Sequence, residues 1–164
     1  MASGSRWTGD PSSSSSAPDD RFRTFLARSF EALRREVPEA YARMCRRLDA
    51  RRVALRVDDE RVAVVFARDE ARIVSDASPG TVEVRTSRTA VLRVIDARDT
   101  LMSAVLADRL VLRGAPRDVL AFHDGLMAYV HGAVRARSFP ELLRQFRQRR
   151  RRTAMPRQGV AEDR

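Results

Sequence analysis

The residues in this sequence best suited to chemistry are two histidines, because imidazole groups act as bases and as metal ligands. His123 and His131 lie eight residues apart in one long apolar helical pattern, so they share a helix face about 12 Å apart along the axis. At that separation they cannot bind one metal ion. His123, Asp124 and a distant Ser could be assembled into a triad, but the pattern favours a His at the margin of an apolar helix.

Other candidate motifs have simpler structural interpretations. Cys45 lies on the apolar stripe of its helix and is expected to be a small core residue. The run Asp58, Asp59 and Glu60 fits a solvated hairpin turn better than a Ca²⁺ loop. Gly114 precedes a helix, but no glycine-rich phosphate-binding fingerprint surrounds it. The sequence therefore predicts no enzyme activity, no metal and no cofactor.

Charge is distributed unevenly along the 164 residues. All 32 basic residues are Arg, and with 22 acidic residues they give a net charge of +10. Residues 53–140 are nearly neutral, so the excess of Arg lies in two flanks, residues 21–52 and 141–164. A single Cys, no signal-like start and no run of about 18 apolar residues predict a soluble cytoplasmic protein.

The chain is predicted to form one domain, residues 19–148, between a disordered leader, residues 1–18, and a basic tail, residues 149–164. The leader is rich in Ser, Gly and Pro, and it cannot bury enough apolar surface to offset the entropy of ordering. Asp19 and Asp20 suit the start of a helix of about 16 residues. One domain is what a chain of this length supports.

The spacing of apolar residues predicts the order of elements. Two helical patterns meet at Pro38, and four strand patterns follow, of which residues 61–67 are apolar on both faces and expected to be central. Two short helices, a fifth strand and a long helix come next, and Ser138 and Glu141 have the spacing of a capping box for a terminal helix. The predicted class is α+β, a largely antiparallel sheet of about five strands with helices covering one face and a basic helical C-terminal extension.

Residues 88–146 hold the most specific pattern in the chain. Apolar residues recur at helical spacing on both sides of the strand-like segment Arg109–Gly114, which indicates helices around an apolar space. The helix ending at Ile95-Asp96, the segment Thr100–Val105 and the closing pattern Tyr129–Arg135 resemble the lipid-binding domain of the sterol carrier protein type-two family. The likeness is greatest to its small, stand-alone bacterial members.

This resemblance implies non-covalent binding of a hydrophobic molecule. It also implies carriage, or presentation of a lipophilic substrate to a separate enzyme, as in accessory proteins of quinone biosynthesis. The chain departs from the family at Ala97, where a Gly usually follows the Asp. Gly takes positive φ freely and Ala does not, so the departure concerns the turn between the two short helices.

We expect an apolar tunnel between the sheet and the helices of residues 89–107 and 116–134. Burying hydrocarbon is worth about 0.8 kcal/mol per CH₂, so a few apolar walls give useful affinity. An adaptor with a filled core, recruited to anionic membrane or nucleic acid by its Arg-rich ends, is the alternative. The predicted lining residues are Leu92, Ile95, Leu101, Met102, Val105, Phe122, Leu126 and Met127.

The Arg-rich flanks leave three interpretations open, of which a merely solvated tail is favoured over contact with an anionic membrane and over contact with nucleic acid. A first helix with Phe22, Phe25 and Phe30 on one side and Arg on others fits a core helix or an interfacial one. The tail could neutralise the phosphates of lipid or nucleic acid, but it lacks interleaved aromatic residues, which disfavours nucleic acid. The residues predicted to make this contact are Arg149, Arg150, Arg151 and Arg152.

Overall fold

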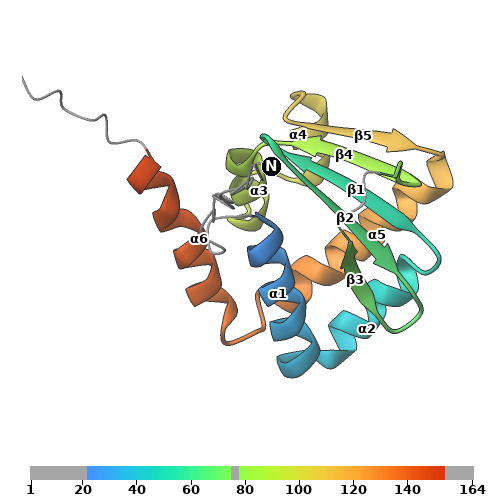
Figure 1. Cartoon of the computed structure of the whole chain (residues 1–164), viewed down its shortest axis with the longest axis horizontal. Helices are drawn as coiled ribbons and strands as arrows, with labels where there is room; N and C mark the ends of the chain where they lie inside the picture. Colours follow the sequence, from blue (N-terminus) through green and yellow to red (C-terminus); the bar gives the residue numbers. More distant parts are fainter. Residues whose placement is uncertain (1–21, 75–77, 154–164) are drawn as a thin grey trace, which may run out of the picture.

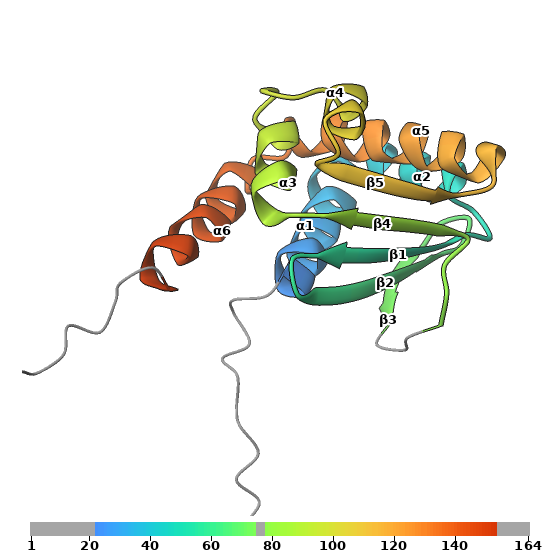
Figure 2. The same ribbon diagram turned by 90° about the horizontal axis from the view of Figure 1, so that it is seen from above.

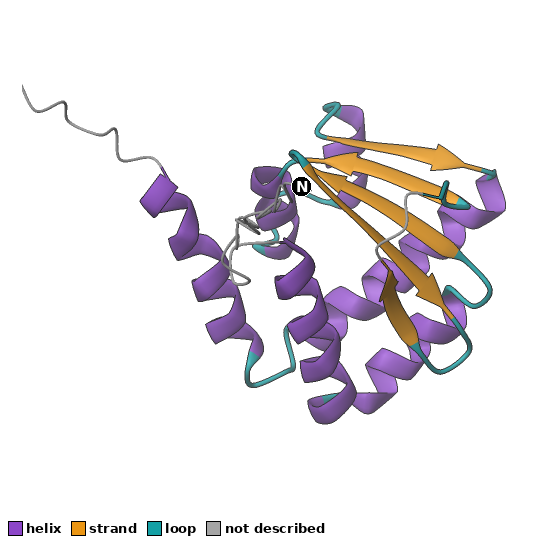
Figure 3. Ribbon diagram, viewed as in Figure 1, coloured by secondary structure: helices purple, strands orange, loops and turns teal. Residues whose placement is uncertain are grey.

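The computed structural model describes residues 22–74 and 78–153, with side chains as far as Gln148. Figure 3 distinguishes its helices from its strands. The helices are α1 (Phe22–Glu36), α2 (Pro38–Arg47), α3 (Arg88–Ile95), α4 (Leu101–Leu106), α5 (Pro116–Ala133) and α6 (Phe139–Thr153). The strands are β1 (Arg52–Val57), β2 (Glu60–Phe66), β3 (Ala71–Val74), β4 (Val82–Thr86) and β5 (Leu110–Gly114). The predicted α+β class and element order are confirmed.

The strands form one mixed sheet in the order β3-β2-β1-β4-β5 (Figure 1). Every neighbouring pair is antiparallel except β1 and β4, which run parallel. The prediction that β2 is central is wrong, because β4 pairs with β1 and so places β1 in the middle. On the outer face of β2, Val65 is 36% exposed and Ala63 is buried, so this apolar face is only partly covered.

Helices cover one face of the sheet. Figure 2 shows α2 and α5 together on one side of the strands. On that side the strands present buried apolar residues, such as Val53 and Val57 of β1, because side chains alternate between the two faces of a strand. None of the described helices is both long enough and apolar enough to span a membrane.

The start of α1 is held by a residue from the sheet. The backbone N–H groups of Phe22 and Arg23 donate to the Glu60 carboxylate, at 2.7 Å to Oε2 and 3.0 Å to Oε1. The first N–H groups of a helix lack partners within it, and a carboxylate there also complements the helix dipole. Glu60, predicted as part of a solvated hairpin turn, is therefore the first residue of β2 and an anchor for α1. Asp19 and Asp20 lie outside the described residues.

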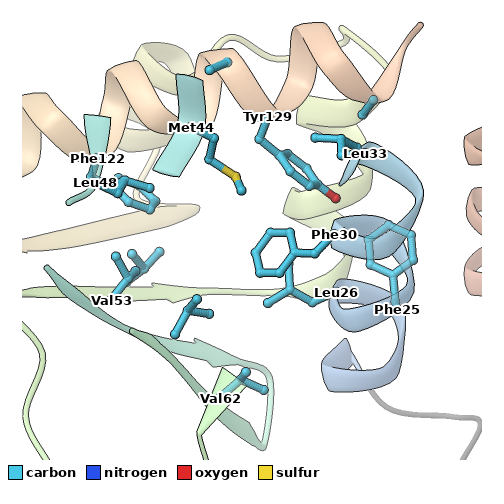
Figure 4. Packing of buried hydrophobic residues seen from close by; sticks show 14 of the residues in the cluster. Phe25, Leu26, Phe30, Leu33, Met44, Leu48, Val53, Val62, Phe122 and Tyr129 are labelled. Carbon is cyan, nitrogen blue, oxygen red and sulfur yellow. The ribbon is translucent and has the colours of Figure 1, made fainter. Parts of the chain in front are cut away.

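Two glycines let α5 approach the neighbouring helices closely. Figure 4 shows the buried residues that pack beside α5. A Cβ atom on Gly125 would lie 2.6 Å from the Leu48 side chain, and one on Gly132 would lie 2.7 Å from Cβ of Ala40. Contacts that short do not occur between real side chains. These two positions therefore bring α5 directly against α1 and α2.

The terminal helix α6 packs on α1 through aromatic rings. Phe146 stacks on Phe25 at 4.3 Å between ring centroids, and Phe139 lies 6.1 Å from the same ring. The Arg88 guanidinium sits 4.0 Å from the centre of the Phe146 ring, a cation–π contact that ties α3 to α6. The aromatic side of α1 therefore faces the core, which agrees with the prediction of a core helix and not with that of an interfacial one.

The predicted capping box at the start of α6 is wrong. Glu141 accepts from Arg144 and Gln145, each at 2.8 Å, and the Ser138 N–H donates instead to Glu36 Oε2 at 3.0 Å. A carboxylate from α1 takes the role expected of Glu141, because the packing of α6 on α1 brings Glu36 there.

The ends of the predicted domain fall partly outside the described chain. The leader, residues 1–18, and residues 154–164 lie outside the described residues. Helix α6 continues to Thr153, so Arg149, Arg150, Arg151 and Arg152 lie within a helix, and their side chains are outside the described part.

The turn between α3 and α4 requires a left-handed backbone. Ala97 has φ of 54°, a region that costs an L-residue with a Cβ about 1–2 kcal/mol. This is the position at which the sequence has Ala where the family that it resembles usually has Gly. Ala107, at the end of α4, has an ordinary φ of −96°.

Replacing Ala97 with Gly should therefore stabilise the protein. We expect Ala97→Gly to raise the free energy of unfolding by about 0.5–1 kcal/mol, the relief of strain minus the entropic cost of Gly. Ala107→Gly, the matched control, should lower it. Urea unfolding of both variants checks this, and equal losses in the two would contradict the assignment of strain to Ala97.

A second prediction concerns acid stability. The hydroxyl and N–H of Ser138 lower the pKa of Glu36 from 4.5 to about 2. A depressed pKa gives stability that is present above about pH 4.5 and is lost as the pH falls toward about 2. The melting temperature of wild type should exceed that of Glu36→Gln at pH 6, and the gap should close over this window. If the difference in melting temperature does not change with pH, the contact between Ser138 and the Glu36 carboxylate does not stabilise the protein as described.

Candidate functional site

An apolar cavity of about 130 Å³ lies between the inner face of the sheet and the helices. Its floor comes from alternate residues of the strands, which the period of two directs inward. The floor residues are Val53, Leu55, Val57, Phe66, Val84, Thr86 and Leu110.

The roof of the cavity is built from helices. Helices α1 and α2 supply Phe22, Phe25, Phe30 and Met44, and Leu48 follows directly after α2. The short helices α3 and α4 supply Ala90, Val91, Val94, Ile95 and Leu101. Helix α5 supplies Phe122, Gly125, Leu126, Tyr129 and Val130. Figure 4 shows Phe30, Met44, Phe122 and Tyr129 gathered in the space between the ribbons of the sheet and α5.

Only two of the lining side chains carry a polar group, and both groups are bonded to the protein. The Tyr129 hydroxyl donates to Ser29 Oγ at 2.9 Å, and burial raises the pKa of Tyr129 to about 12, so this group stays protonated. Thr86 donates its hydroxyl to the Arg109 carbonyl at 2.9 Å. A molecule in the cavity therefore meets hydrocarbon walls.

A cluster of two arginines around one buried aspartate holds the turn beside the cavity. The Asp99 side chain is 6% exposed and accepts from Arg93 Nε at 2.7 Å, with Arg109 at 3.2 Å. The hydrogen bond from Arg93, supported by Arg109, lowers the pKa of Asp99 below its usual range. This cluster fixes α3 relative to α4 and β5, and so holds Ile95 and Leu101 at the wall.

Four of the eight predicted lining residues reach the cavity: Ile95, Leu101, Phe122 and Leu126. Leu92 and Val105 are half-buried and pack against the core without lining the cavity, and Met127 is also half-buried outside it. The prediction for Met102 is wrong, since its side chain is 66% exposed. Helix α4 has six residues and turns Leu101 and Ala104 inward, which leaves Met102 on its outer side.

Sequence reasoning missed the wall residues contributed by the sheet and by α1. The alternation of Val53, Leu55 and Val57 was a usable signal for inward-facing residues. The three Phe residues of α1 were recognised as one face of a helix, but periodicity does not show that this face borders a cavity.

The residues considered for catalysis lie away from this cavity. His123 is exposed and Asp124 is half-buried on α5, with 3.3 Å between Nδ1 and Oδ1, and His131 is also exposed. Cys45 is fully buried, and burial raises the pKa of its thiol, as expected of a core residue. Among residues 22–74 and 78–148, no group of three metal-binding side chains comes together.

Comparisons with known proteins find similar solved structures. A UbiJ-SCP2 ubiquinone synthesis protein shares 16% identity over 66% of this chain and 99% of that one, with a TM-score of 0.49. Sterol carrier protein domain 2 of Helicoverpa armigera shares 12% identity over 68% and 91%, with a TM-score of 0.48. A sterol carrier protein 2 shares 18% identity over 64% and 92%, with a TM-score of 0.46.

These structures carry the name of the family that the sequence resembles. The likeness is one of fold. No protein-family model matches this chain, and no curated protein matches it.

The bonded state of the wall hydroxyls leads to a prediction for Tyr129. Replacing it with Phe removes a buried hydrogen bond, so Tyr129→Phe should lower the free energy of unfolding by about 1 kcal/mol. Affinity for a fluorescent fatty acid should stay within about twofold of wild type, because the hydroxyl is directed at Ser29. Chemical unfolding and lipid titration measure the two effects. A tenfold loss of lipid affinity would show instead that the hydroxyl contacts the ligand.

Proposed function

We propose that this protein binds a hydrophobic molecule in the cavity between its sheet and its helices, without catalysing a reaction on it. The observation that carries this proposal is the hydrocarbon character of the wall. The two polar groups in it, on Thr86 and Tyr129, are already bonded within the protein. Such a wall favours ligands that need no hydrogen bond, because an unpaired polar group would lose its bonds to water on entry.

The size of the cavity fits part of a lipid. An apolar cavity of roughly 150 Å³ in another protein stays dry and binds a benzene-sized molecule. The cavity of about 130 Å³ in this protein is comparable. At about 0.8 kcal/mol per buried CH₂, a short stretch of acyl or isoprenoid chain contributes several kcal/mol.

The biological role that we propose is carriage of this ligand, or its presentation to a separate enzyme. The sequence resemblance to lipid-carrying domains supports it. A cytoplasmic location belongs to the same proposal, supported by Cys45, which is buried and unpaired.

The alternative, an adaptor with a filled core, is less well supported. Ligand-sized space beneath α3 and α5 is not what a close-packed interior leaves. An adaptor would bind through Arg149 to Arg152, and the structure does not describe the side chains of these residues.

Filling the cavity tests the proposal. Leu126→Trp and Val91→Phe add bulk at two wall positions on different helices, and Met102→Trp makes a comparable change at an exposed position. Cavity filling should leave the free energy of unfolding of the delipidated protein within about 1 kcal/mol of wild type, because the added bulk enters unoccupied space. Lipid affinity should fall at least about tenfold in one of the wall variants, and should not change in Met102→Trp.

The measurement is displacement of a fluorescent fatty acid by a panel of fatty acids, acyl-CoAs, sterols, hopanoids and isoprenoid quinones, paired with thermal melting. If every member of the panel fails to bind with a Kd below about 100 μM, the proposal is wrong. Loss of several kcal/mol of stability in both wall variants would favour the filled core, because overpacking costs about 1–3 kcal/mol per site.

A further inference from the structure

The outer face of the sheet, opposite the cavity, carries a row of arginines in register. Arg56 on β1 lies directly across from Arg61 on β2 and from Arg85 on β4. Neighbouring strands are about 4.8 Å apart, so three guanidinium groups arise from a line about 10 Å long. Val111 on β5 ends the row.

These three arginines lack partners within the described residues. All three side chains are exposed, and no hydrogen bond or ion pair within residues 22–74 and 78–148 involves their guanidinium groups. Some other arginines of the domain are paired with acids, as in the 2.9 Å pair of Arg51 with Asp118. Like charges directly opposite each other on a sheet destabilise it, so the row carries a cost that a bound anion would relieve.

The arginine row borders a hollow of about 540 Å³. The floor of the hollow holds Ala54 and Ala63, which are paired with each other across β1 and β2, with Val74 beside them. Arg113 adds a fourth guanidinium, and Glu83 is the one acid among the lining residues. Small side chains between long ones create the depression, and its volume is within the range of small-molecule sites.

The shape and chemistry of the hollow select among anionic partners. No aromatic residue lines it, so the stacking surface on which single-stranded nucleic acid depends is missing from these residues. A flat membrane cannot follow a hollow, and the apolar cavity lies on the opposite side of the sheet. A small anion with several charges can enter it and contact successive arginines.

We propose that the outer face of the sheet is a binding site for a small organic diphosphate, with its phosphates on Arg61, Arg56 and Arg85 and its body over Ala54 and Ala63. Guanidinium groups bind phosphate through two parallel hydrogen bonds, which suits arginine better than any other side chain for this role. Two linked phosphates span the distance between neighbouring strands. The site is separate from the apolar cavity, so either can exist without the other.

Calorimetric titration with inorganic pyrophosphate and with adenosine diphosphate, at about 150 mM salt to screen non-specific attraction, tests this site. Both should bind wild type, and adenosine diphosphate more tightly because its body covers the alanine floor. Arg85→Gln and Arg56→Gln should each weaken binding about tenfold, since a hydrogen bond to a charged group is lost. Arg43→Gln, which removes the same charge from the exposed side of α2, should leave it unchanged.

Two further measurements separate this site from its alternatives. Leu126→Trp, placed in the cavity wall, should bind pyrophosphate as wild type does, and a loss there would show that the two sites are not separate. Equal effects of Arg43→Gln and Arg85→Gln would overturn the proposal, because binding would then follow net charge alone. Binding of a 20-residue oligonucleotide or of phosphatidylglycerol vesicles, with no binding of pyrophosphate, would also overturn it.

Discussion

The close packing of α5 on α1 and α2 determines where the cavity lies. Gly125 and Gly132 remove the side chains that would hold these helices apart, and Leu48 and Leu33 fill the space. Because its contacts with α1 and α2 fix its position, α5 lies over the sheet and directs Phe122 and Leu126 into the cavity. A larger residue at either glycine would lift the roof or displace the Leu side chain beneath it.

The ends of the cavity depend on contacts between elements that are distant in sequence. Phe22 and Phe25 belong to the wall, and Phe25 is in turn stacked on Phe146 of α6. Helix α1 is fixed at one end by Glu60 and at the other by the bond from Ser138 to Glu36. The terminal helix therefore supports the cavity from outside, through α1, without lining it.

Much of the fold could be predicted from the sequence, because the spacing of apolar residues changes between helix and strand at identifiable positions. The alternation of Val53, Leu55 and Val57 with other residues predicted both a strand and the face of it that is buried. The position of β4 beside β1, which makes β1 central, could not be predicted, since pairing over that distance leaves no local pattern. The same holds for Glu60 and Glu36, whose partners are 37 or more residues away. At the site, the helical stripes identified Ile95 and Leu126 correctly, but short α4 gives too few residues to tell Leu101 from Met102.

The central claim is that the space beneath α5 holds a hydrophobic molecule. Native mass spectrometry of freshly purified protein, followed by solvent extraction and identification of what is released, tests it most directly. The account predicts a population heavier than the 18.6 kDa chain by the mass of one lipid-like molecule. That population should be reduced in Leu126→Trp and retained in Met102→Trp. A single species at the mass of the bare chain, which also fails to take up any lipid on incubation, would contradict the claim.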